Sequence, residues 1–134
     1  MMQRWVIRDY VTPQGRNVVR DWMHKDLTSL DRMRLEERLS EIETRRSDIP
    51  DLPPEWVKKY KTSNVYEVKV LGDNKQLRPL AIKKSSEIII LRGAIKKGGK
   101  ISDGDIDAAE KNLKFFLRGE GSAEFHFPAD EEEN

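Results

Sequence analysis

Apolar residues recur along this chain at two spacings, every second position in some segments and every third or fourth position in others. β-Forming residues fill positions 4–10 and stop at Thr12-Pro13, which predicts a first strand. Residues 14–25 carry an apolar stripe at helical spacing, and Thr12 as cap with Pro13 in the first turn is the expected start of that helix. The chain is therefore predicted to begin as a strand followed by a helix.

A second helix is predicted directly after the first. Thr28-x-x-Asp31 has the pattern of a capping box, and apolar residues then recur at i, i+4 and i+7 among Arg and Glu. These apolar residues are Leu35, Leu39 and Ile42. We expect this helix to end at Asp48-Ile49-Pro50, because proline cannot continue it. The two helices should form a hairpin with one buried face.

Three strand-like runs follow over residues 64–71, 76–83 and 87–92, and the polar turns between them are short. Short turns predict an antiparallel meander. The stretch from Ile88 to Leu91 is apolar without alternation, which indicates a central strand covered on both faces. A helix predicted over residues 102–117 is expected to cover its second face.

The C-terminal residues are acidic. From Glu120 onward we expect the chain either to fray or to dock Phe125-His126-Phe127 as an extra strand. The predicted fold class is α+β: an N-terminal strand, a helical hairpin, an antiparallel meander and a C-terminal helix. We expect one domain over residues 1–119 and an acidic tail over residues 120–134.

Composition limits the chemistry that the protein can perform. There is no cysteine, and only His24 and His126 supply imidazoles, so the sequence predicts no zinc site, no thiol nucleophile and no cofactor. We assign no function to either histidine. No apolar run approaches the roughly 18 residues that span a bilayer, and Met1 does not open a secretory signal. We therefore expect a cytoplasmic protein without a membrane partner.

Charge is distributed unevenly between body and tail. Residues 1–119 carry 25 Lys and Arg against 18 Asp and Glu, whereas residues 120–134 carry six acidic residues and no Lys or Arg. A basic surplus on a small domain favours polyanionic partners, although it also serves solubility.

Four motifs follow one another in the second half of the chain. They are Asn64-Val65-Tyr66-Glu67-Val68-Lys69-Val70, Leu77-Arg78-Pro79-Leu80, Ile90-Leu91-Arg92-Gly93-Ala94-Ile95-Lys96-Lys97 and Ile106-Asp107-Ala108-Ala109. In this order and spacing the chain resembles the RelE/ParE toxin superfamily, and its phage-derived, HigB-like branch in particular. The resemblance covers residues 60–117 well and the N-terminal half only by architecture.

This resemblance implies a RelE-like fold and the toxin of a type II toxin–antitoxin system. The implied activity is that of a ribosome-dependent mRNA endonuclease, or mRNA interferase, which inhibits translation. The implied partners are mRNA, the ribosome and a cognate antitoxin of the helix-turn-helix kind. Cleaving RNA at its own 2′-OH needs a base, cations that stabilise the phosphorane and a proton donor, and side chains can supply all of these without a metal.

The resemblance also implies roles for particular residues. Lys69 sits where the family often has a catalytic Arg or Lys, Arg78 matches a phosphate-stabilising Arg, and Lys97 belongs to the basic pair after the last strand. On a strand, Glu67 lies on the same face as Lys69, so both are candidates for the base. The expected RNA contacts are Arg92, which replaces a family His, Lys96 and Lys100.

Plainer interpretations stay open for these residues. Glu67 and Lys69 can form a cross-strand ion pair, and the lysines at 96–100 can form a solvated loop. Arg78 shares the parity of Leu80, which would aim it at the core. At the level of function, the alternatives are a ParE-like DNA gyrase inhibitor and a degenerate member that only binds RNA or protein.

Overall fold

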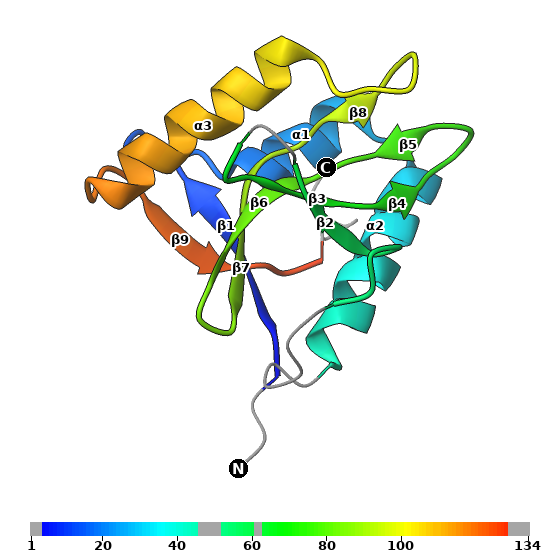
Figure 1. Cartoon of the computed structure of the whole chain (residues 1–134), viewed down its shortest axis with the longest axis horizontal. Coiled ribbons are helices and arrows are strands. Elements are labelled where there is room, and N and C mark those ends of the chain that lie inside the picture. The colour runs from blue at the N-terminus through cyan, green and yellow to red at the C-terminus, as the bar shows by residue number, and fades with distance from the viewer. Residues whose placement is uncertain (1–3, 46–51, 61–62, 129–134) are drawn as a thin grey trace.

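The structure of the protein is a computed structural model, and it describes residues 4–45, 52–60 and 63–128. The fold is α+β, as predicted: a six-stranded sheet in the order β2-β3-β6-β7-β1-β9 carries helices on both faces, and a three-stranded sheet in the order β4-β5-β8 adjoins it (Figure 1). The strands are β1 (Val6–Val11), β2 (Val57–Lys59), β3 (Tyr66–Val68), β4 (Val70–Leu71), β5 (Gln76–Leu77), β6 (Leu80–Lys84), β7 (Glu87–Arg92), β8 (Ile95–Lys96) and β9 (Ser122–Phe125). The helices are α1 (Val18–Asp26), α2 (Ser29–Glu43) and α3 (Asp103–Leu117).

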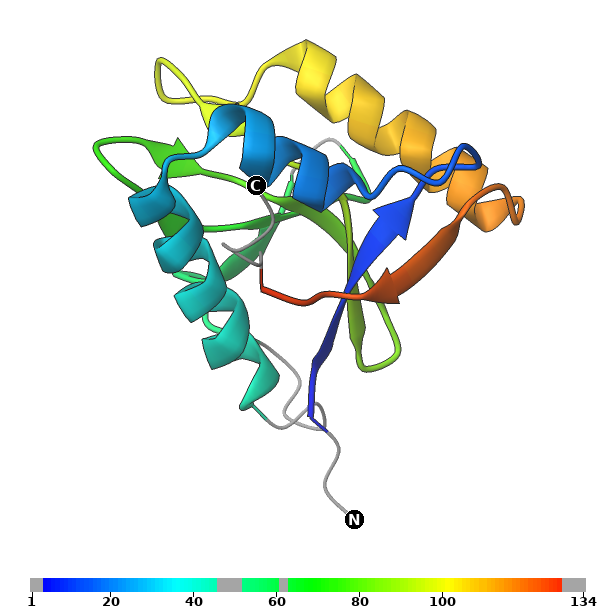
Figure 2. The same ribbon diagram turned by 180° about the vertical axis from the view of Figure 1, so that it is seen from behind.

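Strand β7 is the centre of the main sheet, as its unbroken apolar run predicts. It pairs antiparallel with β6 and parallel with β1. Ile88 and Ile90 enter the core under α1 and α2, whereas Ile89 and Leu91 enter the core under α3. Figure 1 shows α3 across one face of the sheet, and Figure 2 shows α1 and α2 across the other. A strand buried on both faces needs apolar side chains at every position, which is why no alternation is seen.

Helix α1 begins later than predicted. The expected start at Thr12-Pro13 is wrong, because Thr12 closes a turn in which its N–H donates to the carbonyl of Arg16 at 2.9 Å. The cap is Asn17, whose side-chain oxygen accepts from the backbone N–H of Val19 and Arg20. A buried Asn at this position satisfies two free helix donors, and no residue of the turn does so.

Helices α2 and α3 follow their predicted starts. Thr28 and Asp31 form the capping box of α2, with the Thr28 side chain accepting from the Asp31 N–H at 3.1 Å. The α2 helix ends at Glu43, before the predicted end at residues 48–50, which lie outside the described residues. Ser102 caps α3, and Gly119, with a φ of 78°, follows its end as the sequence predicts.

The predicted meander is present, but two of its strands bend. The first run splits into β3 and β4 at Lys69, and the second splits into β5 and β6 at Arg78-Pro79. At the bend, the Lys69 N–H donates to the carbonyl of Trp56 at 2.7 Å, while Arg78 and Ala94 exchange two backbone hydrogen bonds. These outside partners turn the chain out of the main sheet and into the small one. Trp56 and Ala94 directly precede β2 and β8, two strands that were not predicted.

The C-terminal segment docks on the body. Strand β9 pairs antiparallel with β1, and the N–H of His126 donates to the carbonyl of Ile7 at 3.0 Å. The expectation of an extra strand is therefore confirmed, with the strand over Ser122–Phe125, and the expectation of fraying is wrong as far as Pro128. The last acidic run, from Asp130 to Glu133, lies outside the described residues.

Candidate functional site

The bend between the two sheets brings predicted site residues together. Glu67 Oε1 lies 3.4 Å from Arg78 Nε, and these side chains are only 13% and 9% exposed. Val70 of β4 pairs antiparallel with Leu77 of β5, so the next residues outward, Lys69 and Arg78, stand opposite each other. We call Glu67, Lys69, Gln76, Arg78 and Lys96 the Arg78 cluster.

Arg78 is held by its neighbours within this cluster. Its Nη1 donates to the carbonyl of Leu77 at 2.9 Å, and its Nη2 donates to Gln76 Oε1 at 2.8 Å. Its Nε faces Glu67 at ion-pair distance without forming an aligned hydrogen bond. Burial lowers the pKa of Arg78, and the charge of Glu67 opposes this shift. The parity argument is therefore right that Arg78 is buried, although its guanidinium lies among polar partners.

Lys96 completes the cluster from the third strand of the small sheet. It is paired with Gln76 in the β5–β8 ladder, and residues directly opposite on paired strands share a face. Lys96 is half-buried, whereas Gln76 is exposed. The cluster thus has a buried ion pair at its base and an exposed amide at its rim.

The remaining predicted residues lie together in a second place. Arg92, Lys97 and Lys100 line a groove of about 460 Å³ between the end of α1, β7–β8 and the start of α3. We call this concavity the lysine groove; its other lining residues are Trp22, Asp26, Gly93, Ala94, Ile95, Ser102 and Asp105. Arg92 Nε donates to Asp105 Oδ1 at 2.8 Å. Lys97 and Lys100 are exposed and have no ion-pair partner within the described ranges.

One wall of the lysine groove depends on a glycine that sequence reasoning did not single out. A Cβ at Gly93 would overlap the indole ring of Trp22. Trp22 is buried and reaches the groove from α1, so the backbone of β7–β8 can pass it only where residue 93 has no side chain. The Leu91-Arg92-Gly93 motif contains this glycine, but the sequence does not show that it packs against Trp22, which lies 71 positions earlier.

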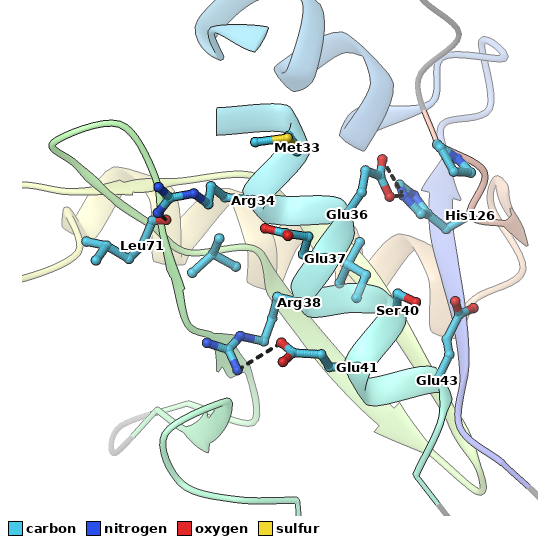
Figure 3. Close-up of a pocket in the computed structure, with 13 residues that line it drawn as sticks. Met33, Arg34, Glu36, Glu37, Arg38, Ser40, Glu41, Glu43, Leu71 and His126 are labelled. Atoms are coloured by element: carbon cyan, nitrogen blue, oxygen red, sulfur yellow. Dashed lines mark hydrogen bonds and ion pairs between the residues drawn. The ribbon is translucent and has the colours of Figure 1, made fainter. Parts of the chain in front are cut away.

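Sequence reasoning also missed His126, which was assigned no function. Its Nδ1 lies 3.0 Å from both carboxylate oxygens of Asp9 on β1. Its Nε2 lies 2.8 Å from Glu36 Oε1 on α2, a contact that Figure 3 shows. The side chain is 5% exposed. Burial alone would lower the pKa of His126, but the hydrogen bonds and charges of Asp9 and Glu36 raise it to about 10. The group is therefore an imidazolium between two carboxylates.

Asn17 extends this cluster to two further elements. Its side-chain nitrogen donates to Asp9 Oδ2 at 3.0 Å and to Glu124 Oε1 at 2.7 Å, while its oxygen caps α1. We call Asp9, Asn17, Glu36, Glu124 and His126 the His126 cluster. It joins β1, α1, α2 and the C-terminal segment. Both nitrogens of the imidazole are occupied by protein partners, which suits a structural role rather than proton transfer to a substrate.

A cavity of about 780 Å³ lies along the outer side of α2, next to His126 (Figure 3). Its lining mixes Met33 and Leu71 with acidic and basic residues of α2, and it contains none of the predicted site residues. Across residues 4–45, 52–60 and 63–128, no group of three or more His, Asp or Glu side chains is arranged to hold a metal ion. No helix in that part of the chain is long and apolar enough to cross a membrane.

Comparison with known proteins adds a family to this geometry. The sequence model of the family described as phage-derived protein Gp49-like (DUF891) matches residues 25–114. Curated proteins and solved structures gave no match to the chain. The matched range is about two thirds of the chain and contains the Arg78 cluster and the whole lining of the lysine groove except Trp22. The chain therefore belongs to the phage-derived Gp49-like family, and this membership is compatible with a toxin-like function.

Proposed function

We propose that this protein is the toxin of a type II toxin–antitoxin pair and inhibits translation in the cytoplasm by cutting mRNA on the ribosome. The four ordered motifs support the RelE/HigB-like assignment, and the family match is compatible with it. A cognate antitoxin, of the helix-turn-helix kind, is the partner that would silence it.

The observation that carries the proposal is the ion pair of Glu67 with Arg78 at the bend between the sheets. Burying such a pair costs desolvation free energy, and an apolar pair of similar volume is often at least as stable. Charged groups with perturbed pKa values gather at functional sites more often than elsewhere. By strand register Lys69 stands opposite Arg78 and Lys96 opposite Gln76, so a candidate base and several cations are grouped at the bend between the sheets.

The proposed chemistry assigns one step to each kind of group. Glu67 or Lys69 takes the proton of the 2′-OH as its oxygen attacks the adjacent phosphorus. Arg78 and Lys97 stabilise the negative charge that develops on the phosphorane, and a lysine ammonium gives a proton to the leaving 5′-oxygen. Gln76 is exposed, so a phosphate oxygen can replace its amide at Nη2 of Arg78 without unfolding the bend. This side-chain chemistry requires no cofactor.

The test is primer extension on a reporter mRNA after induction of the protein without antitoxin. We expect growth arrest and cuts that require translation, and both should be abolished when a translation block keeps ribosomes off the reporter. Glu67→Gln should reduce the cuts, and His24→Gln, an exposed change on α1, is the matched control that should leave them unchanged. Intact reporter mRNA during full growth arrest would contradict the nuclease and favour the gyrase alternative.

A further inference from the structure

The lysine groove contains an arrangement that is unfavourable without a ligand. Lys97 and Lys100 are joined by the two-residue turn Gly98-Gly99, in which both glycines have positive φ, 57° and 78°. The two lysines exchange backbone hydrogen bonds of 3.0 and 3.1 Å. Residues paired in this way lie about 5.5 Å apart between Cα atoms and project their side chains to the same side. Like charges directly opposite one another destabilise a ladder, so this turn holds two ammonium groups together at a cost.

A third cation completes the set on the same wall of the groove. Arg92 uses only its Nε on Asp105, and its two terminal nitrogens have no hydrogen-bond partner in the described part of the chain. Its side chain is 42% exposed. The groove therefore presents a planar guanidinium and two ammonium groups to solvent, the combination that binds a phosphate oxygen from more than one side.

Asp105 can compete with an anionic ligand for Arg92, and it can release Arg92 because it has other partners. One of its oxygens accepts from Arg92, and the other accepts from the Ser102 hydroxyl at 2.9 Å. The carboxylate also stands in the first turn of α3, where the helix dipole stabilises negative charge. If a phosphate takes Arg92, Asp105 keeps its Ser102 and helix partners and is not left unsatisfied.

We propose that the lysine groove is a phosphate subsite, in which Lys97, Lys100 and Arg92 bind a phosphodiester group of single-stranded RNA while Asp105 occupies Arg92 in the free protein. That the polyanion is RNA rests on the proposed function. That the groove binds a phosphate group rests on its three cations. No residue of the Arg78 cluster lines this subsite, and its task is to hold the strand at the phosphodiester group on which Lys97 acts during cleavage.

The experiment measures binding of a fluorescein-labelled 2′-O-methyl pentauridylate, which cannot be cut at its 2′ position, by anisotropy over a salt series. We expect the Lys97→Gln/Lys100→Gln variant to bind more weakly, with the slope of log K against log salt reduced by about 0.7 for each lost contact. Asp105→Asn should bind about two- to fivefold more tightly, the range expected when one exposed charge partner is removed. Inorganic phosphate should compete only at far higher concentration than RNA.

Two matched controls separate charge from helix stability. Asp103→Asn removes a carboxylate from the same turn of α3 without touching Arg92, and Ser102→Ala removes the helix cap without changing the charge of the groove. We expect neither to tighten binding. The lysines lie on an exposed turn, so the double variant should keep the melting temperature of the wild type.

The proposal would be overturned by no binding by the wild type at low salt, by an unchanged salt slope in the double lysine variant, or by equal affinities for folded Asp105→Asn and Asp103→Asn. Binding of this uncleavable oligonucleotide is measured independently of cleavage, so binding here together with intact reporter mRNA in the primer-extension test would refute the proposed function and leave the subsite standing. Competition by phosphate as strong as by RNA would show an ion site rather than a strand site, and would also overturn the proposal.

Discussion

The His126 cluster and the lysine groove both concentrate charge, and they do so in opposite ways. In the first, an imidazolium is enclosed, and each of its nitrogens faces a carboxylate at 2.8 to 3.0 Å. In the second, three cations face solvent, and Arg92 is the only one with a carboxylate partner in the ranges that the structure describes. Enclosed and matched charge holds elements together, whereas open and unmatched charge is available to a ligand. This difference distinguishes a polar cluster with a structural role from a group of charges that can bind a ligand, and it does not depend on sequence motifs.

The largest expected effect breaks the enclosed cluster. His126→Ala leaves Asp9 and Glu36 facing each other without the cation between them, and removing one partner of a buried ion pair costs about 3–5 kcal/mol. Urea denaturation of the variant should show this loss of unfolding free energy. His24→Ala removes an exposed imidazole and should change it by less than about 0.5 kcal/mol. Equal stability of the two variants would mean that the cluster contributes nothing to the fold.

In the lysine groove, truncating a charged side chain to alanine should change activity rather than stability. Lys97→Ala is expected to lower mRNA cleavage by about 10²-fold at an unchanged melting temperature, because it removes an exposed cation that acts on developing charge. Arg78→Ala should lower cleavage similarly but also cost about 1–3 kcal/mol of stability, because Glu67 loses its buried partner. Single-turnover cleavage and thermal melting, measured on the same samples, distinguish the two. A destabilised Lys97→Ala would remove the contrast.

A pH series sharpens the comparison further. The pKa of His126 is about 10 in the folded protein and near the ordinary value of 6.5 when unfolded, so its stabilisation is complete below about 6.5 and is lost as pH rises through about 10. Between these limits, the unfolding free energy should fall by about 1.4 kcal/mol per pH unit relative to His126→Gln. The carboxylates that face the imidazole are Asp9 and Glu36, and the charge of the imidazole also acts on Glu43. Parallel pH profiles for wild type and variant would contradict the imidazolium.

The smallest expected effect concerns the acidic C-terminus. Deleting all of residues 120–134 would remove β9 and His126 and therefore test folding, so the informative truncation ends at Pro128. It removes four carboxylates, and charge interactions through water are screened beyond roughly 8 Å in physiological salt. RNA affinity should rise by less than about twofold, as an anisotropy titration can measure. A larger gain would show that these carboxylates oppose the lysine groove.

Local signals made most of the fold predictable. The capping box at Thr28 and Asp31, the unbroken run of β7 and the spacing of α3 each depend on residues within a few positions of one another, and each is confirmed. The start of α1 was misplaced because Thr12-Pro13 offers a plausible cap, and the competing cap, Asn17, gains its advantage from Asp9 and Glu124. Burial in the tertiary structure, not local propensity, decided between the two.

The site was predictable only in part, for the same reason. Residues that share a motif, such as Arg92, Lys96 and Lys97, could be singled out from their spacing, and the structure places them at two neighbouring concentrations of charge. His126 could not be singled out, because its partners Asp9 and Glu36 lie 117 and 90 positions earlier. The roles of Glu67, Lys69 and Arg78 in catalysis stay predictions.

The pairing of β9 with β1 also has a consequence for how the chain folds. Arg8 lies opposite Phe125, so β1 is synthesised long before the strand that pairs with it on this side. Contacts between such distant residues close a long loop and slow folding, because the entropy of loop closure is lost before the contact forms. A nascent chain that stops before residue 122 exposes the edge of β1, which makes truncated products prone to aggregation.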